Sequence, residues 1–413
     1  MTPILTISPA KLLDELLVNR TVQRALEYFA HEAEAITSDQ IRICSIPAPP
    51  FGEAERAISL LETFKRDGLS EVRLDAEGNC VALRRGRSLR PLMVVAAHLD
   101  TVFPAGTDFS IKSSDGKLFG PGISDDGCGL AAIIVLNRTL QRHEIRTGGS
   151  LLFVGTVGEE GEGDLRGVRH LLTNGEWANQ IDAFLSIDGP GSARITNAAL
   201  GSRRYRVRFS GRGGHSWGDF GVENPVHAVG RAVARLVSYP APRDPRTTFN
   251  VGRIEGGTGV NVIPHEATMF VDLRSASSDE LQRLDAFFRR AVREAVDDEN
   301  TNHCQNEPLL EAEVELIGNR PGGQTAADSP LVELAIAATN FIGRAPRLDQ
   351  ASTDSNMPIS LGIPAITLGG GGSSGNSHTL EEWYDPRDRD LGLKRALLVI
   401  LGSVGVTILS DLQ

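Results

Sequence analysis

The sequence predicts an α/β fold with a mostly parallel central sheet, into which a smaller α+β domain is inserted. Outside residues 201–318, short continuous apolar runs alternate with helical stretches, which is typical of buried parallel strands. Inside that range, the expected elements follow the order β-α-β-β-α-β. The length of 413 residues also exceeds what one hydrophobic core usually organises, which favours two domains.

The larger domain begins with about 90 residues that read as helices followed by a pair of strands, including a helix from Glu53 to Asp67 that Gly68 ends. Four apolar runs follow that stop at, or lead to, polar residues: PLMVVAAHLD, SLLFVGTVGEE, AFLSIDGP and IPAITLGGGG. In open parallel sheets the ligand crevice lies outside the carboxyl ends of the strands. We therefore expect the polar residues that follow these strands to converge there. The glycine cluster Gly369–Gly375 predicts a close approach of the backbone to the substrate.

The inserted domain is predicted from six segments within residues 201–318. They are the strand RRYRVRFSG, the helix NPVHAVGRAVARLVSYP, the strands TTFNVGRIEG and EATMFVDLRS, the helix SDELQRLDAFFRRAVREAVDDEN and the strand LEAEVELIG. This order is that of a ferredoxin-like split unit. Residues 1–200 and 319–413 are then expected to form the two parts of the larger domain.

Composition and charge exclude several classes of protein. The net charge of -11 disfavours a nucleic-acid partner, whose phosphates demand a basic surface. The apolar runs are too short to cross a membrane, and the first 20 residues lack a basic region followed by an apolar one, so we expect neither a membrane partner nor a secretory signal. The four scattered cysteines, Cys44, Cys80, Cys128 and Cys304, are expected to be reduced thiols in a cytoplasmic protein.

Five short stretches carry residue types that bind metals. They are HLDT from His98, SDDG from Ser124, EEGEGD from Glu159, SIDG from Ser186, and NSH ending at His378. Together they supply two histidines and a group of carboxylates, a ligand set that suits Zn²⁺, with Co²⁺ or Mn²⁺ as alternatives.

These stretches resemble the M20 family of metallopeptidases, through the ordered motifs AHLDTV, GPGISDDG, TVGEEGEGDLRGVR, GRGGHS, GVNVIPHEATMFVDLR and NSH. The resemblance implies a zinc-peptidase catalytic domain whose inserted domain serves as lid and dimerisation domain, and hence a homodimer. It also implies two divalent metal ions. His98 and Asp188 hold one ion, Glu160 and His378 hold the other, and Asp125 bridges both.

Five further residues have expected roles, four of them implied by the same resemblance and that of Asp100 by its spacing from His98. Glu159 is the general base that takes the proton of the attacking water. Asp100, two residues past His98 on the strand, accepts the other ring N–H of that histidine. His215 on the inserted domain helps to bind the oxyanion, in the partner subunit of dimeric relatives. Arg274 and Asn261 hold the substrate's carboxylate or backbone.

The leading functional prediction is a di- or tripeptide aminopeptidase. The glutamate loop looks close to that of peptidase T, Asp188 is an aspartate, and Glu162 and Asp164 offer extra carboxylates for a free ammonium group. An N-acyl-amino-acid deacylase or carboxypeptidase of the same fold is the alternative. A non-catalytic peptide-binding protein ranks below both. Such a protein is expected to have lost the general base, whereas Glu159 is present.

Overall fold

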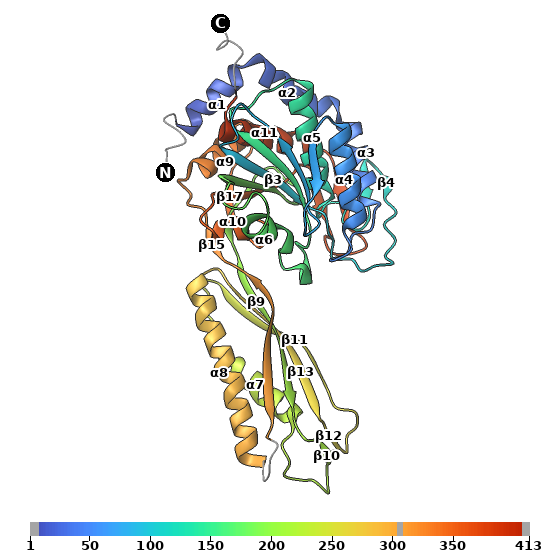
Figure 1. The fold of residues 1–413 in the computed structure, drawn as a ribbon, viewed down its shortest axis with the longest axis vertical. Helices are drawn as coiled ribbons and strands as arrows, with labels where there is room; N and C mark the ends of the chain where they lie inside the picture. The colour runs from blue at the N-terminus through green and yellow to red at the C-terminus, as the bar shows by residue number, and fades with distance from the viewer. Residues whose placement is uncertain (1–7, 304–308, 407–413) are drawn as a thin grey trace. The chain divides into compact units, whose positions relative to one another are not determined.

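The computed structural model describes residues 8–303 and 309–406, which leaves Cys304 outside the described residues. The chain forms two compact units (Figure 1). Unit 1 consists of the chain up to Ala199 and from Gln324 onward, and unit 2 of Leu200–Gly323. The inserted range expected from the sequence was 201–318.

Unit 1 begins with four helices and a hairpin. Ser8 caps the first helix, Asn19 caps the second, and apolar residues at helical spacing bury one side of each. The elements are α1 (Pro9–Val18), α2 (Arg20–His31), α3 (Ala33–Cys44), α4 (Ala54–Arg66), β1 (Glu71–Leu74) and β2 (Cys80–Arg84). The predicted helix and strand pair are both present.

The central sheet of unit 1 has the strand order β1-β2-β6-β3-β7-β17-β8-β15, with β16 beside β8. Its remaining strands are β3 (Leu92–His98), β6 (Ser150–Thr156), β7 (Ala183–Ile187), β8 (Arg194–Ala199), β15 (Gly323–Gln324), β16 (Arg347–Ala351) and β17 (Ala365–Leu368). The strands β6, β3, β7 and β17 run parallel to one another, whereas β2 and β8 pair antiparallel with this block. The expectation of a mostly parallel sheet is confirmed.

Helices cover both faces of this sheet (Figure 1). Along β3, Met93, Val95 and Ala97 join the apolar cluster that contains α5 (Gly127–Arg142), α9 (Pro330–Phe341) and α11 (Arg389–Val404). The alternating residues of β3 join a second cluster with α6 (Arg166–Thr173) and α10 (Asn356–Ser360). Because successive side chains point to opposite faces, a strand that is buried on both sides reads as a continuous apolar run.

A small second sheet in unit 1 has the order β18-β19-β5-β4. Its strands are β4 (Lys112–Ser114), β5 (Lys117–Phe119), β18 (Ser373–Gly375) and β19 (Trp383–Asp385). The glycine cluster that leads into it packs on the protein itself: a Cβ at Gly371 would lie 2.3 Å from the carbonyl oxygen of Arg389, and one at Gly372 would lie 2.5 Å from the Tyr384 hydroxyl. Both glycines have positive φ. The predicted close approach of the backbone is therefore present at these two glycines, but the atoms that it approaches belong to the chain itself.

Unit 2 is an antiparallel sheet of order β11-β13-β9-β14 with α7 and α8 on one face (Figure 1). The order along the chain is the predicted β-α-β-β-α-β. Tyr205, Val207 and Phe209 of β9 pack against Phe288 of α8 in its core. The elements are β9 (Gly201–Ser210), β10 (Gly214–His215), α7 (Pro225–Leu236), β11 (Thr247–Gly256), β12 (Val262–Ile263), β13 (Glu266–Ser275), α8 (Ser278–His303) and β14 (Glu311–Arg320).

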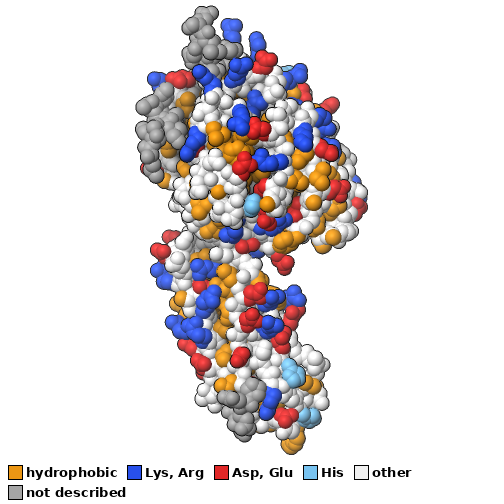
Figure 2. Space-filling model, in the orientation of Figure 1, with side chains coloured by type: hydrophobic (Ala, Val, Ile, Leu, Met, Phe, Trp, Pro, Cys, Tyr) orange, Lys and Arg blue, Asp and Glu red, His pale blue; other side chains and the backbone are white. Residues whose placement is uncertain are grey.

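The molecular surface carries charges of both signs. On the face shown in Figure 2, Lys and Arg side chains are interspersed with Asp and Glu side chains over both units. Within residues 8–303 and 309–406, no helix is both long and apolar enough to span a bilayer.

Candidate metal centre

The metal-type side chains follow neighbouring strands at one edge of the central sheet. His98 is the last residue of β3, Asp188 follows β7 directly, and Glu159 and Glu160 follow β6 after a short turn. The three strands are adjacent and parallel, so their carboxyl ends meet at the same edge. The apolar runs thus deliver these residues to one place.

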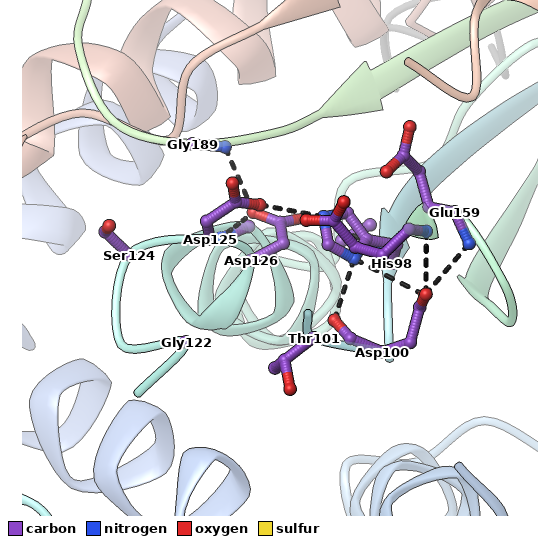
Figure 3. Close-up of polar contacts among 12 residues, drawn as sticks. His98, Asp100, Thr101, Gly122, Ser124, Asp125, Asp126, Glu159 and Gly189 are labelled. Atoms are coloured by element: carbon purple, nitrogen blue, oxygen red, sulfur yellow. Dashed lines mark hydrogen bonds and ion pairs between the residues drawn. The ribbon is translucent and has the colours of Figure 1, made fainter. Parts of the chain in front are cut away.

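Asp125 lies between two imidazoles. Its Oδ1 is 3.0 Å from Nε2 of His98, and its Oδ2 is 3.1 Å from Nε2 of His378 (Figure 3 shows the contact with His98). The same nitrogen of His378 lies 3.1 Å from Oε1 of Glu160. One carboxylate therefore contacts both histidines at once, one through each oxygen, so each oxygen lies beside a different imidazole.

Two groups of donor atoms share Asp125. His98, Asp125 and Asp188 offer ligand atoms within 4.8 Å of one another, and so do Asp125, Glu160 and His378. These are the two ligand sets that the family resemblance implies. Three carboxylates and two imidazoles converging in this way make a set of nitrogen and oxygen donors that suits two divalent ions such as Zn²⁺. The residues present fit the implied metals.

Protonation at this edge is governed by burial and by close pairs. Burial raises the pKa of Asp188 to about 7, and the charge of Asp125 adds to the rise. Hydrogen bonds to Asp125 and Glu160 raise the pKa of His378 to about 10. Burial opposes the charged form of His98, yet Asp100 and Asp125 raise its pKa well above the usual range. Carboxylates this crowded are relieved when cations bind among them.

Asp100 connects the histidine to the glutamate loop. Strand β3 ends at His98, so Asp100 lies beyond the strand, and Nδ1 of His98 is 3.0 Å from its carbonyl oxygen and 3.5 Å from its carboxylate. The carboxylate also accepts the backbone N–H groups of Glu159 at 3.0 Å and Glu160 at 2.7 Å (Figure 3). The sequence predicted that the carboxylate accepts the ring N–H of His98, but the backbone carbonyl of Asp100 lies closer to that nitrogen. The clamp on the two glutamates was not predicted.

Glu159 is buried and close to the metal-type residues. Its carboxylate can approach His98 and Glu160 as a third group within 4.8 Å. In Figure 3 this side chain points away from Asp100, which is bound to the backbone nitrogen of the same residue. Asp100 therefore holds the backbone of Glu159 and Glu160, while the carboxylate of Glu159 points away from Asp100.

Two buried residues with ionisable side chains, which the sequence did not assign to the site, hold its backbone. Asp126 caps α5 by accepting from the N–H of Gly129, and it also accepts from the N–H groups of Gly189 and His98. Arg56, fully buried, donates to the carbonyl of Leu99, between His98 and Asp100. Asp126 could have been recognised from the sequence as an N-cap residue. No sequence pattern indicates that Arg56 on α4 is buried beside the site.

The remaining predicted residues lie in unit 2. His215 is exposed on β10, and its Nδ1 accepts from the N–H groups of Trp217 at 3.2 Å and Gly218 at 3.3 Å. Asn261 lies near it, since its carbonyl accepts from the N–H of Ser216.

Arg274 on β13 and the acidic residues after the glutamate pair have local contacts of their own. Nε of Arg274 donates to Asp272 at 2.6 Å, so a substrate carboxylate would compete with this pair. Arg169 lies 3.3 Å from the carboxylate of Asp164 and offsets its charge. Glu162 is exposed. Of the two carboxylates expected to attract an ammonium group, Asp164 is therefore partly neutralised.

Comparison with known proteins identifies relatives across the chain. Residues 94–401, a range that contains the whole metal-type cluster, match peptidase family M20/M25/M40. YqjE of Bacillus subtilis, an uncharacterised protein, is 26% identical over 359 residues, which cover 84% of this chain and 90% of YqjE. Succinyl-diaminopimelate desuccinylase of Nitrosococcus oceani is 32% identical over 221 residues, which cover 49% of this chain and 57% of that protein.

A solved structure shows the same fold. Aminopeptidase PepT from Bacillus cereus superposes with a TM-score of 0.71 at 23% identity, over 90% of this chain and 98% of that chain. At this identity the likeness concerns the fold.

Proposed function

The chain belongs to peptidase family M20/M25/M40 and is a hydrolase, and from this premise we propose that it uses two divalent metal ions to hydrolyse an amide bond in di- and tripeptides, releasing the N-terminal residue. The observation that carries the proposal is the pair of ligand groups that share Asp125. Two-metal sites recur in hydrolytic enzymes, aminopeptidases among them.

In the proposed site, His98 and Asp188 hold one ion, Glu160 and His378 hold the other, and Asp125 bridges them. When bound, two such ions polarise the amide carbonyl and lower the pKa of a water to near neutrality. Zn²⁺ is the proposed metal because imidazole and carboxylate are its common ligands. Asp100 keeps the imidazole of His98 oriented, since its carbonyl and carboxylate oxygens both lie near Nδ1.

Glu159 is the proposed general base. It takes a proton from the attacking water and returns it to the leaving amine. Glu160 is the proposed metal ligand, so the two adjacent carboxylates have different roles in the proposed mechanism. The clamp of Asp100 on both backbone N–H groups supports this division, because it fixes the peptide that separates the two side chains.

His215 is proposed to donate a hydrogen bond to the oxyanion. Its Nδ1 accepts two backbone N–H groups, so in the neutral ring the proton belongs on Nε2. Stabilisation of an oxyanion requires a hydrogen-bond donor. In that tautomer the neutral ring already offers one at Nε2. The donor is proposed to act across a homodimer.

An N-acyl-amino-acid deacylase is the second candidate. It is favoured by the ion pair of Asp164 with Arg169, which reduces the negative charge available to a free ammonium group. The desuccinylase relative, although it matches about half of this chain, also removes an acyl group by its name. A deacylase would accept a blocked amine that an aminopeptidase rejects.

A substrate scan with zinc-loaded protein separates the two candidates. We expect unblocked di- and tripeptides to be cut with kcat/KM at least tenfold above their N-acetylated forms, because a site built for one polar end discriminates strongly. Amidation of the C-terminus should also lower kcat/KM if Arg274 holds the far carboxylate. Faster cleavage of N-acyl amino acids would replace the aminopeptidase proposal with the deacylase.

A further inference from the structure

Glu382 is a fully buried carboxylate close to the metal-type cluster. It is 0% exposed, and its Oε1 accepts from the N–H of Ser124 at 2.7 Å, the hydroxyl of Ser124 at 2.7 Å and the N–H of Asp125 at 3.1 Å. Its Oε2 accepts from the N–H of Gly122 at 3.1 Å. All four donors belong to the segment that precedes α5, labelled in Figure 3 at Gly122, Ser124 and Asp125.

This carboxylate links two segments that are remote in sequence. Glu382 lies four residues beyond His378 and 257 positions beyond Asp125 in the chain. The strand that follows it, β19, pairs with β5, which precedes the Asp125 segment. The carbonyl of Glu382 also accepts from the N–H of Gly120. The loop with His378 is thereby tied to the loop with Asp125 through both backbone and side chain.

The link matters because the contact between Asp125 and His378 requires their two loops to keep fixed positions relative to each other. Oδ2 of Asp125 is 3.1 Å from Nε2 of His378, and its Oδ1 faces His98 at the same time. His378 itself is half exposed and has a φ of 66°, a left-handed conformation that non-glycine residues hold only when their surroundings impose it. The bonds of Glu382 supply such a constraint on one side of this loop.

We propose that Glu382 is a positioning residue that holds Asp125 between the two histidines and so sets the metal affinity of the site. The inference rests on the proposed metal site. Without the carboxylate, three backbone N–H groups and one hydroxyl would lose their acceptor in a buried place, and the segment would move to find others. Asp125 would move with it, because its own N–H is one of the four donors.

The test measures zinc affinity by competition with a chromophoric chelator, independently of turnover. Glu382→Ala should weaken zinc binding by about 10–100-fold, as is typical when a partner of a metal ligand is removed. Glu382→Gln keeps one acceptor oxygen but places an NH₂ group opposite a donor, so its loss should be smaller. Ser124→Ala removes a single hydroxyl donor and should cost a few-fold at most. With Co²⁺ in place of zinc, the visible absorption of Glu382→Ala should change, since it reports ligand geometry.

The matched control is Glu299→Ala. Glu299 is equally buried, accepts from the N–H of Asn224 and pairs with Arg231, but it lies in unit 2. It should lower thermal stability while leaving zinc affinity and the cobalt spectrum unchanged.

The outcomes separate the inference from the proposed function. If wild-type protein binds two zinc ions and Glu382→Ala binds them with equal affinity, the role of Glu382 is overturned and the metal site stands. If Glu299→Ala weakens zinc as much as Glu382→Ala, the effect is general destabilisation, which also overturns it. If Glu382→Ala does not fold, wild-type affinity and spectrum in Glu382→Gln decide against the inference. Wild-type protein that takes up no zinc overturns the metal site and this inference together.

Discussion

Adjacent carboxylates have different surroundings at this edge of the sheet. Asp125 faces two imidazoles, whereas Asp126 accepts backbone N–H groups from three segments. Glu160 contacts His378, whereas the Glu159 carboxylate makes a separate approach to His98. His98, Glu160 and Asp188 could be singled out as ligand-type residues because each ends or follows a buried strand, whereas Asp125 precedes α5 and His378 lies in a loop. The sequence could not predict which buried charges hold backbone, because Arg56 and Glu382 have no local pattern that separates them from surface residues.

At the scale of single residues, Glu159→Ala should reduce turnover by about 10²–10⁴-fold while metal content stays unchanged. The reason is that the proposed base and the proposed ligand are different side chains. Turnover of the best peptide and metal per chain would be measured on the same preparation.

Glu176→Ala is the control, because Glu176 is an exposed carboxylate in the same unit that pairs with Arg73. It should retain wild-type turnover. Near-normal activity of Glu159→Ala, or loss of metal from it, would contradict the assignment.

At the scale of elements, three of the proposed ligands end or follow strands of the central sheet, and Asp125 lies just before α5. Continuous apolar runs predicted β3, β6, β7 and β17, since both faces of the sheet are covered. The glycine cluster was harder to interpret, because a sequence shows that backbone approaches something but not what it approaches. Gly129 is a similar case within a helix. A Cβ there would lie 2.3 Å from both carboxylate oxygens of Asp126 and from the carbonyl of Ile187.

Gly129→Ala should therefore destabilise the protein, by about 1–3 kcal/mol as expected for overpacking against backbone. The same change at Gly230 in α7, where nothing lies within 4 Å of the added Cβ, should stabilise by about 0.5–1 kcal/mol through helix propensity. Differential scanning calorimetry of metal-free protein compares the two. If both substitutions shift the melting temperature in the same direction, the lack of space around Gly129 does not determine how Gly129→Ala changes stability.

At the scale of the whole molecule, the chain leaves the larger unit and returns to it. All five proposed ligands and Glu159 belong to unit 1, and His215 belongs to unit 2. The insertion could be predicted because the strand pattern changes from continuous apolar runs to alternation, as in β9. The assembly of chains could not be predicted from such patterns, since it depends on surfaces and not on periodicity. The homodimer therefore stays a prediction from family resemblance.

Subunit mixing tests that prediction through His215. In a dimer where each site uses the partner's histidine, His215→Ala and Glu159→Ala chains are each inactive alone. A mixed dimer has one site with both residues intact. Equal mixing should restore about one quarter of wild-type turnover, because half of the dimers are mixed and each has one working site.

The control mixes Glu159→Ala with Asp100→Asn, which should not complement because both changes fall in unit 1 and no site in the mixed dimer is intact. Exchange of subunits would be verified with differently tagged chains before activity is read. Recovery in the His215 mixture alone requires that unit 2 of one chain completes the site of the other. Exchange without recovery would show instead that His215 acts within its own chain or outside the reaction.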